Sequence, residues 1–391
     1  MAACSSSPAS CKRPSFEIAD VVRAHGAAFA ASHSLTPEQS AVLRAVGRCR
    51  TAALGGHLDV CRDCGHERPS YNSCRNRHCP KCQALAQAQW IAEREERILP
   101  TTHFHVVFTI PSELHVLARF RREEFFKALF AAVSSTLLDL GEEQLGAVLG
   151  ATLVLHTWTR DLRFHPHIHA IVTGGGLARD GSRWVATRND YFMPVKLLGA
   201  VFRDRLVQGL CALRRAGAFE DFEIEGGLDR LLGKVATKSW VVYAKRPFGG
   251  AEHVLRYLGR YTHRVGISNQ RMVSMSDEGL VTFRTKNGKA VTLPAEEFLA
   301  RFVDHVLPPQ FVKIRHIGLL APSNVGTKLA RARELLTAPT AAPTPAKTAT
   351  TWLELVLALV EAETMRCPAC GGQLVRGPLP EVGVEARSDT S

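Results

Sequence analysis

The sequence contains no apolar segment that could cross a bilayer, since a membrane helix needs about 20 consecutive apolar residues. Its longest candidate, Leu145–Leu155, is too short and includes two glycines. The opening residues, Met1–Pro8, also lack the apolar core of a secretory signal. We therefore expect a cytoplasmic, nucleoid-associated protein that has no membrane partner and keeps its cysteines reduced.

Acidic residues are also scarce relative to basic ones. The chain has 37 Asp and Glu against 49 Lys and Arg, which gives a formal net charge of +12. This excess favours a polyanionic partner, nucleic acid before a membrane surface. Five of the eleven cysteines lie between Cys61 and Cys82, and in a reducing compartment such bunching indicates metal sites rather than disulfides.

The order of patterns along the chain predicts an α+β fold around a mostly antiparallel sheet flanked by helices, because strands alternate with helices and hairpin turns recur. Thr36 and Pro37 mark a helix start. The expected strands are His103–Ile110, Ala151–Trp158, the histidine-rich segment after it, Ser239–Ala244, a meander over Ile267–Leu293, and Phe311–Leu320. The expected later helices are Glu113–Leu140, Val195–Arg215, Leu228–Thr237, Ala251–Arg264 and Ala295–Leu307.

The same patterns divide the chain into five parts. The first is a loosely ordered leader over residues 1–34, and the second is a zinc-binding domain with flanking helices over 35–99. A larger α+β domain covers 100–325. A linker rich in Pro, Ala and Thr follows over 338–351, and a C-terminal tail occupies 352–391.

Two Cys-x-x-Cys turns predict the zinc site. Cys61 and Cys64 form the first pair and Cys79 and Cys82 the second, and four thiolates complete a tetrahedral Zn²⁺ site. Cys74 and His78 lie in the loop between them and could replace one ligand or help to hold a second ion. Cys367 and Cys370 lack a neighbouring partner pair, so we expect a turn that binds no metal.

The loop of this zinc module is basic. Arg75, Arg77 and Lys81 form a rim suited to contacts with DNA phosphates. A zinc module that serves only as a structural staple is an equally open reading.

The segment His165–His169 predicts a second metal site. On a strand, side chains alternate between faces, so His167 and His169 point the same way and can share one divalent cation. His156, on the preceding strand, is the expected third ligand, with His165 as the competing one. We interpret His103 and His105, which form a similar pair, as part of the sheet structure.

The segment Ala251–Arg264 places two tyrosines, Tyr257 and Tyr261, one helical turn apart on one face. With a metal-binding histidine pair upstream, two phenol nucleophiles indicate cleavage of single-stranded DNA through a phosphotyrosine link. The alternative is an amphipathic helix whose tyrosines pack against the sheet. Cations on and before this helix suit backbone phosphates: Lys245, Arg256, Arg260 and Arg264.

Taken in order, these motifs resemble the two-tyrosine HUH transposases of the insertion-sequence-ninety-one family. The segments that carry the resemblance are Ser73–Gln83, Phe104–Pro111, Leu155–Trp158, His165–Gly176 and Tyr257–Val265. The one departure is Thr159-Arg160, where the resemblance implies Gly-Gln.

The resemblance implies an N-terminal zinc-binding domain followed by an HUH nuclease palm, with Tyr257 and Tyr261 as nucleophiles and His167 and His169 as metal ligands. It also implies Mg²⁺ or Mn²⁺ at the histidines and structural Zn²⁺ at the cysteines. The expected activity is rolling-circle transposition, in which single-stranded or hairpin element ends are nicked through a 5′-phosphotyrosine and joined to target DNA.

Two other functions remain open from the sequence. A rolling-circle replication initiator performs the same chemistry at a fixed origin. A non-catalytic zinc protein that only binds DNA belongs to a different class, and a protein of that class would bind element ends without nicking them.

Overall fold

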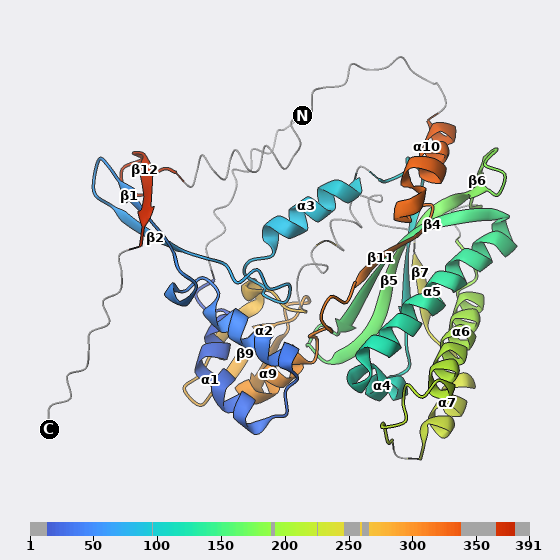
Figure 1. The fold of residues 1–391 in the computed structure, drawn as a ribbon, viewed down its shortest axis with the longest axis horizontal. Coiled ribbons are helices and arrows are strands. Elements are labelled where there is room, and N and C mark those ends of the chain that lie inside the picture. Colours follow the sequence, from blue (N-terminus) through green and yellow to red (C-terminus); the bar gives the residue numbers. More distant parts are fainter. Residues whose placement is uncertain are drawn as a thin grey trace.

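The computed structural model describes residues 14–95, 97–188, 192–224, 226–245, 259, 266–337 and 365–379. Helices combine there with three antiparallel sheets, so the predicted α+β class is confirmed (Figure 1). No helix in these ranges is both long enough and apolar enough to cross a membrane.

The largest sheet has the strand order β11-β4-β5-β3-β7, with β6 paired to β5. Its strands are β3 (His103–Thr109), β4 (Ala147–Trp158), β5 (Phe164–Ala178), β6 (Trp184–Ala186), β7 (Val242–Lys245) and β11 (Ile314–Gly318). The strands predicted over 103–110 and 151–158 and the histidine-rich strand are thus confirmed. Alternation along β3–β5 sends apolar side chains to one face and the histidines to the other.

The apolar face of this sheet carries the main core. Phe104 and Phe108 of β3 and Ile168 of β5 are fully buried there against helices α5 and α6. The helices on this side are α4 (His115–Phe120), α5 (Arg122–Leu145), α6 (Val195–Arg215) and α7 (Leu228–Ala236). Helix α3 (Ala84–Glu95) covers part of the opposite face, where Trp90 packs on Val154 and Ile171. The histidines lie on this same face of the sheet, since His169 is directly opposite Val154.

A second body joins the N-terminal helices to a segment from far along the chain. Helices α1 (Ile18–Ser32) and α2 (Pro37–Arg48) share a core with a small sheet and helix α9 (Ala295–Val303). The small sheet consists of β8 (Met272–Met275), β9 (Leu280–Arg284) and β10 (Ala290–Pro294). Residues 18–32 are thus an ordered helix rather than the predicted loose leader, because Ile18, Val21 and Phe29 are buried in this core.

The third sheet has the strand order β12-β1-β2. It consists of β1 (Gly56–Cys61), β2 (Glu67–Tyr71) and β12 (Leu374–Pro378). Figure 1 shows the red C-terminal strand beside the two blue N-terminal strands. Helix α10 (Ala330–Leu336) lies near β6.

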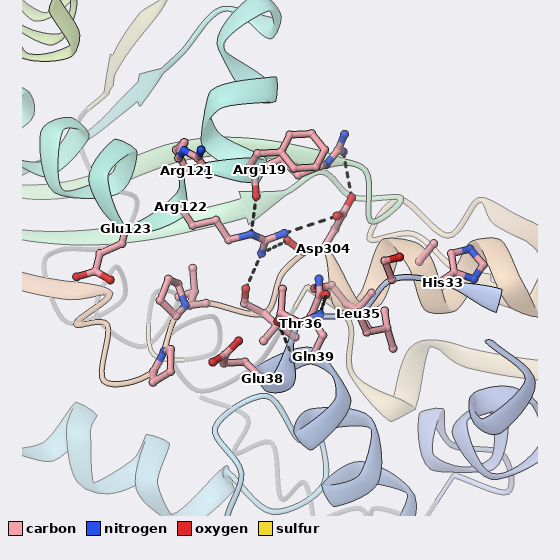
Figure 2. A pocket seen from close by; sticks show the side chains of 18 of the residues that line it. His33, Leu35, Thr36, Glu38, Gln39, Arg119, Arg121, Arg122, Glu123 and Asp304 are labelled. Carbon is pink, nitrogen blue, oxygen red and sulfur yellow. Dashed lines mark hydrogen bonds and ion pairs between the residues drawn. The ribbon is translucent and has the colours of Figure 1, made fainter. Parts of the chain in front are cut away.

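The first two bodies meet at the corner between α4 and α5. The guanidinium of Arg122 donates to the backbone carbonyls of Asp304 and Val306, and Arg119 pairs with Asp304 at 3.0 Å. A cavity of about 630 Å³ lies at this junction (Figure 2). Both acidic and basic side chains line it, among them Glu38, Glu123, Arg121 and Arg122, so it offers no uniform field to a polyanion.

Candidate active site and metal centres

Three histidines converge on the face of the main sheet that also carries α3. His156 of β4 lies directly opposite His167 of β5, and His169 follows two residues later on the same face. One ring nitrogen from each lies within 4.8 Å of the others. The Nε2 atoms of His167 and His169 are 3.1 Å apart, which suits two ligands on one ion at metal–nitrogen distances of about 2.1 Å.

Hydrogen bonds orient two of these rings. Nδ1 of His167 lies 2.7 Å from the carbonyl oxygen of His165, so that nitrogen carries the proton and donates it. Nδ1 of His169 lies 2.7 Å from Nε2 of His105 on β3. In both rings Nε2 is therefore free to face the point between the three histidines where an ion would bind. Metal-binding histidines are commonly oriented in this way, by a hydrogen bond from the ring nitrogen that does not contact the metal.

Burial keeps these imidazoles neutral. It lowers the pKa of His167 to about 4, and it lowers the pKa values of His156 and His169 well below the ordinary value. A neutral imidazole is the form that binds a metal, so the cluster is ready for a cation at neutral pH. The donor set of three neutral nitrogens fits a divalent transition ion and leaves further coordination positions to oxygen ligands.

The histidines form the floor of a cavity of about 340 Å³. Trp158 stacks on His156 with ring centroids 4.8 Å apart. The cavity also has three cationic side chains and, among its described lining residues, no carboxylate; its lining consists of His156, Trp158, Thr159, Arg160, His165, His167, His169, Gly266, Arg271 and Lys286. This charge favours an anionic ligand such as a phosphodiester.

Two loops hold the cationic rim in place. Arg271 donates to the backbone carbonyls of Gly266, Arg284 and Arg160, and Arg160 donates to the side chain of Asn287. Thr159 donates to Asp161, and its hydroxyl accepts from the N–H of Arg163. The Thr159-Arg160 pair that departs from the family pattern therefore builds the turn at the cavity edge.

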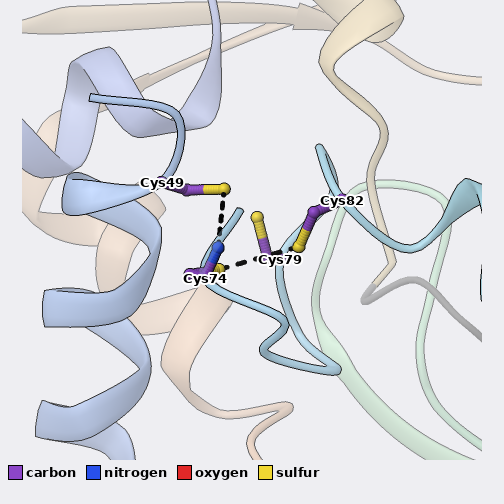
Figure 3. A group of neighbouring side chains, drawn as sticks. All are labelled: Cys49, Cys74, Cys79 and Cys82. Carbon is purple, nitrogen blue, oxygen red and sulfur yellow. Dashed lines mark hydrogen bonds between the residues drawn. The ribbon is translucent and has the colours of Figure 1, made fainter. Parts of the chain in front are cut away.

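The cysteines form two clusters, neither of which is the predicted one. Cys49, Cys74, Cys79 and Cys82 lie with their sulfurs within 4.8 Å of one another (Figure 3). The Sγ atoms of Cys74 and Cys82 are 3.7 Å apart, close to the edge of about 3.8 Å that a tetrahedron with zinc–sulfur bonds of about 2.3 Å requires.

The predicted grouping of Cys61 and Cys64 with Cys79 and Cys82 is therefore wrong. Cys61 and Cys64 lie with Cys367 and Cys370 instead, so the prediction of a lone C-terminal turn is also wrong. Strand β1 carries the first pair away from the loop of the second, and the sheet pairing of β1 with β12 brings in the C-terminal pair. His78 joins neither cluster, because its Nε2 accepts from the N–H of Leu307 inside the protein.

The basic loop residues have different surroundings. Arg75 is exposed, whereas Lys81 pairs with Glu17 at 2.5 Å. Arg77 was predicted to contact DNA, and this prediction is wrong. Its guanidinium donates to the backbone carbonyls of Phe311 and Pro308, and burial lowers its pKa. Lys245 is exposed at the end of β7, opposite His105 of β3.

The tyrosine segment falls outside the described residues. This applies to the predicted nucleophiles Tyr257 and Tyr261 and to the predicted DNA contacts Arg256, Arg260 and Arg264. Gly259, which is described, is buried so close to α3 that an added Cβ would lie 2.5 Å from Ile91.

Several residues that the structure brings to these sites were not predicted from the sequence. His105 was interpreted as sheet structure, although its alternation with His103 follows the pattern of the ligand pair. Cys49 lies outside any Cys-x-x-Cys turn and gives no local signal. Arg271 and Lys286 are ordinary cations of a meander, and only tertiary packing brings them to the cavity.

Comparisons with known proteins place these sites in context. A family model described as "Putative transposase" matches residues 150–328, and one described as "Transposase zinc-binding domain" matches residues 21–110. The chain is 40% identical to "Putative transposase y4qJ" of Sinorhizobium fredii, over 92% of the chain and 94% of that relative. It is 28% identical to the "Transposase for insertion sequence element IS801" of Pseudomonas savastanoi pv. phaseolicola, over 84% and 80%.

Solved structures give a more distant likeness. The conjugative relaxase TrwC in complex with oriT DNA matches 41% of the chain and 72% of its own length, with 17% identity and a TM-score of 0.25. A metal-bound structure of the same relaxase matches 41% of the chain with a TM-score of 0.24.

Proposed function

The chain belongs to the insertion-sequence-ninety-one family of transposases, and from this we propose that it nicks and joins single strands at element ends through a phosphotyrosine. The observation that carries the proposal is the cluster of His156, His167 and His169 on the floor of a cationic cavity. It supports a site that binds a phosphodiester beside a divalent cation.

In this proposal His156, His167 and His169 hold Mg²⁺ or Mn²⁺, which supplies Lewis-acid polarisation of the scissile phosphate. His105 and the carbonyl of His165 fix the ligand rings. Arg160 and Lys286 bind the flanking phosphates, and Arg271, whose guanidinium donates to three backbone carbonyls, holds the loop of Arg160 in place and adds positive charge to the cavity.

Tyr257 and Tyr261 act as the nucleophiles. The phenol oxygen attacks phosphorus, the bond to the 3′ oxygen breaks, and the leaving strand keeps a 3′-hydroxyl after taking up a proton. Attack by a 3′-hydroxyl on the 5′-phosphotyrosine reverses the step and joins a new strand. Gly266, five residues after Tyr261 in the sequence, lines the cavity.

Zinc at Cys49, Cys74, Cys79 and Cys82 has a structural role in this proposal. These thiolates complete a closed four-ligand site that leaves no position for a reactive water. Cys79 belongs to the core of the second body, so this zinc ties the loop with Arg75 and Lys81 to α2 and α9. Contacts of Arg75, Lys81 and Lys245 with DNA are part of the proposal.

A cleavage assay on labelled single-stranded element ends tests it. The wild type is expected to form a covalent protein–DNA adduct with Mn²⁺ and to lose it with EDTA. Tyr257→Phe and Tyr261→Phe should each weaken strand transfer, and His167→Ala with His169→Ala should abolish the adduct. Undiminished nicking by the double phenylalanine variant would refute the nucleophiles, and binding without any nicking would favour the non-catalytic DNA-binding protein.

A further inference from the structure

Two Cys-x-x-Cys turns from opposite ends of the chain lie face to face. The Sγ atoms of Cys61 and Cys370 are 3.5 Å apart, and those of Cys64 and Cys367 are 3.6 Å apart. The paired residues are separated by 309 and 303 positions in sequence. These distances are far longer than a disulfide bond of about 2.05 Å and close to the edge of about 3.8 Å of a zinc–thiolate tetrahedron.

The two turns have the same backbone construction. The N–H of Cys61 donates to the carbonyl of His66, and the N–H of Cys367 donates to that of Gly372, five residues later in each case. In each turn a glycine just after the second cysteine donates back to the first cysteine. These glycines, Gly65 and Gly371, have φ values of 69° and 76°, a left-handed conformation that side chains with Cβ rarely adopt.

The shared motif is thus Cys-x-x-Cys-Gly, and it distinguishes this pair from the other cluster. Cys82 is followed by Gln83, and Cys49 has no cysteine three residues away. Turns of one construction that face each other bring four sulfurs together from two sides, which is how paired knuckles complete a tetrahedral site.

The module around these cysteines has little else to stabilise it. Its buried apolar cluster consists of Cys61, Cys367 and Leu374 alone among the described residues. The central strand carries a buried carboxylate, Asp59, which accepts from Arg68 of β2 and Arg376 of β12. A sheet of three short strands with so small a core depends on a metal or a covalent link to remain folded.

We infer that Cys61, Cys64, Cys367 and Cys370 bind a second Zn²⁺, distinct from the one at Cys49, Cys74, Cys79 and Cys82, and that this ion fastens the C-terminal segment to the N-terminal region. The ion completes a small zinc module built from both ends of the chain, with β12 as its third strand. Cys367 and Cys370 lie outside residues 21–110, the range of the matched zinc-binding domain. The inference is independent of the proposed nuclease chemistry.

Zinc content of the reduced full-length chain tests the first part. We expect two Zn²⁺ per wild-type chain and one after Cys367→Ser with Cys370→Ser. Cys74→Ser with Cys82→Ser is the matched control and should also leave one. A double variant at 367 and 370 that keeps both ions, or a wild type that binds one, overturns the inference. So does alkylation mass spectrometry that finds Cys61 and Cys370 oxidised to a disulfide.

A cut chain tests the fastening. A protease site is introduced at residue 345 and cleaved after the protein has folded. The C-terminal fragment is then followed by size-exclusion chromatography. The fragment should co-elute with the remainder, and it should separate after chelation or in the variant at 367 and 370, but not in the control at 74 and 82. Each double variant serves as the folding control of the other. Co-elution that persists both after chelation and in the variant at 367 and 370 refutes the inference.

Discussion

His105 offers the sharpest test of how the histidine site is assembled. Its Nε2 lies 2.7 Å from Nδ1 of His169, and the two rings stack at 5.0 Å with planes 11° apart. The substitution His105→Phe keeps a ring in the stack and removes the ring nitrogen that faces Nδ1 of His169. His169 can then rotate or change tautomer, which turns its Nε2 away from the shared position.

The magnitude follows from outer partners of metal ligands in general. Their loss weakens metal binding by about 10- to 100-fold, or roughly 1.4 to 2.8 kcal/mol. The Mn²⁺ concentration for half-maximal adduct formation should therefore rise by that factor in His105→Phe. At saturating Mn²⁺ the rate should return close to the wild-type value, because no residue of the cavity lining has changed.

His103→Phe is the matched control. His103 lies on the same strand and face and is buried more deeply than the half-buried His105, but its Nδ1 bonds to the backbone carbonyl of Thr101. We expect its metal midpoint to match that of the wild type. An equal shift in both variants would assign the effect to general damage of β3, and an unshifted midpoint in His105→Phe would show that the hydrogen bond does not orient the ligand.

Three further predictions follow from the fold and the cavity. Lys286→Gln should weaken binding of single-stranded DNA and reduce the magnitude of the slope of log affinity against log salt concentration by about 1. Fluorescence anisotropy at several salt concentrations measures this slope, and an unchanged slope would show that Lys286 does not contact the DNA. Phe108→Ala should lower the free energy of unfolding by about 3–5 kcal/mol, because this ring is fully buried between β3 and α6; denaturant titration measures the change, and a loss under 1 kcal/mol would contradict the packing. Burial lowers the pKa of His305 to about 3, so between pH 6.5 and 3 the unfolded chain takes up a proton that the folded chain does not, and this group should reduce the free energy of unfolding by about 1.4 kcal/mol per pH unit as the pH falls. In His305→Gln the dependence of the free energy of unfolding on pH should be smaller by about one proton, and a pH profile identical to that of the wild type would refute the shift.

Local patterns predicted much of the secondary structure. The helix expected over Val195–Arg215 matches α6, and Thr36 caps α2 through a hydrogen bond from the N–H of Gln39. These features depend on residues within a few positions of one another, where sequence spacing and spatial proximity agree. The same holds for His167 and His169, whose common face follows from the alternation of a strand.

Partners distant in sequence were beyond such patterns. Ligand spacing suggested that Cys61 and Cys79 share an ion, whereas the sheet pairs β1 with a strand that begins at Leu374. The N-terminal helix α1 gave a weak signal as well, because the core that buries Ile18 is supplied by β8–β10 and α9, from residue 272 onward.

The sequence by itself therefore determined much of the secondary structure, the histidine pair, the clustering of cysteines in pairs and the family. Tertiary structure alone decided which cysteines lie together, that His105 contacts His169, and that Arg271 and Lys286 line the histidine cavity. The physical reason is that alternation and capping act along the chain over a few residues. Coordination and charge act through space, between segments that only the packing of sheets and helices brings together.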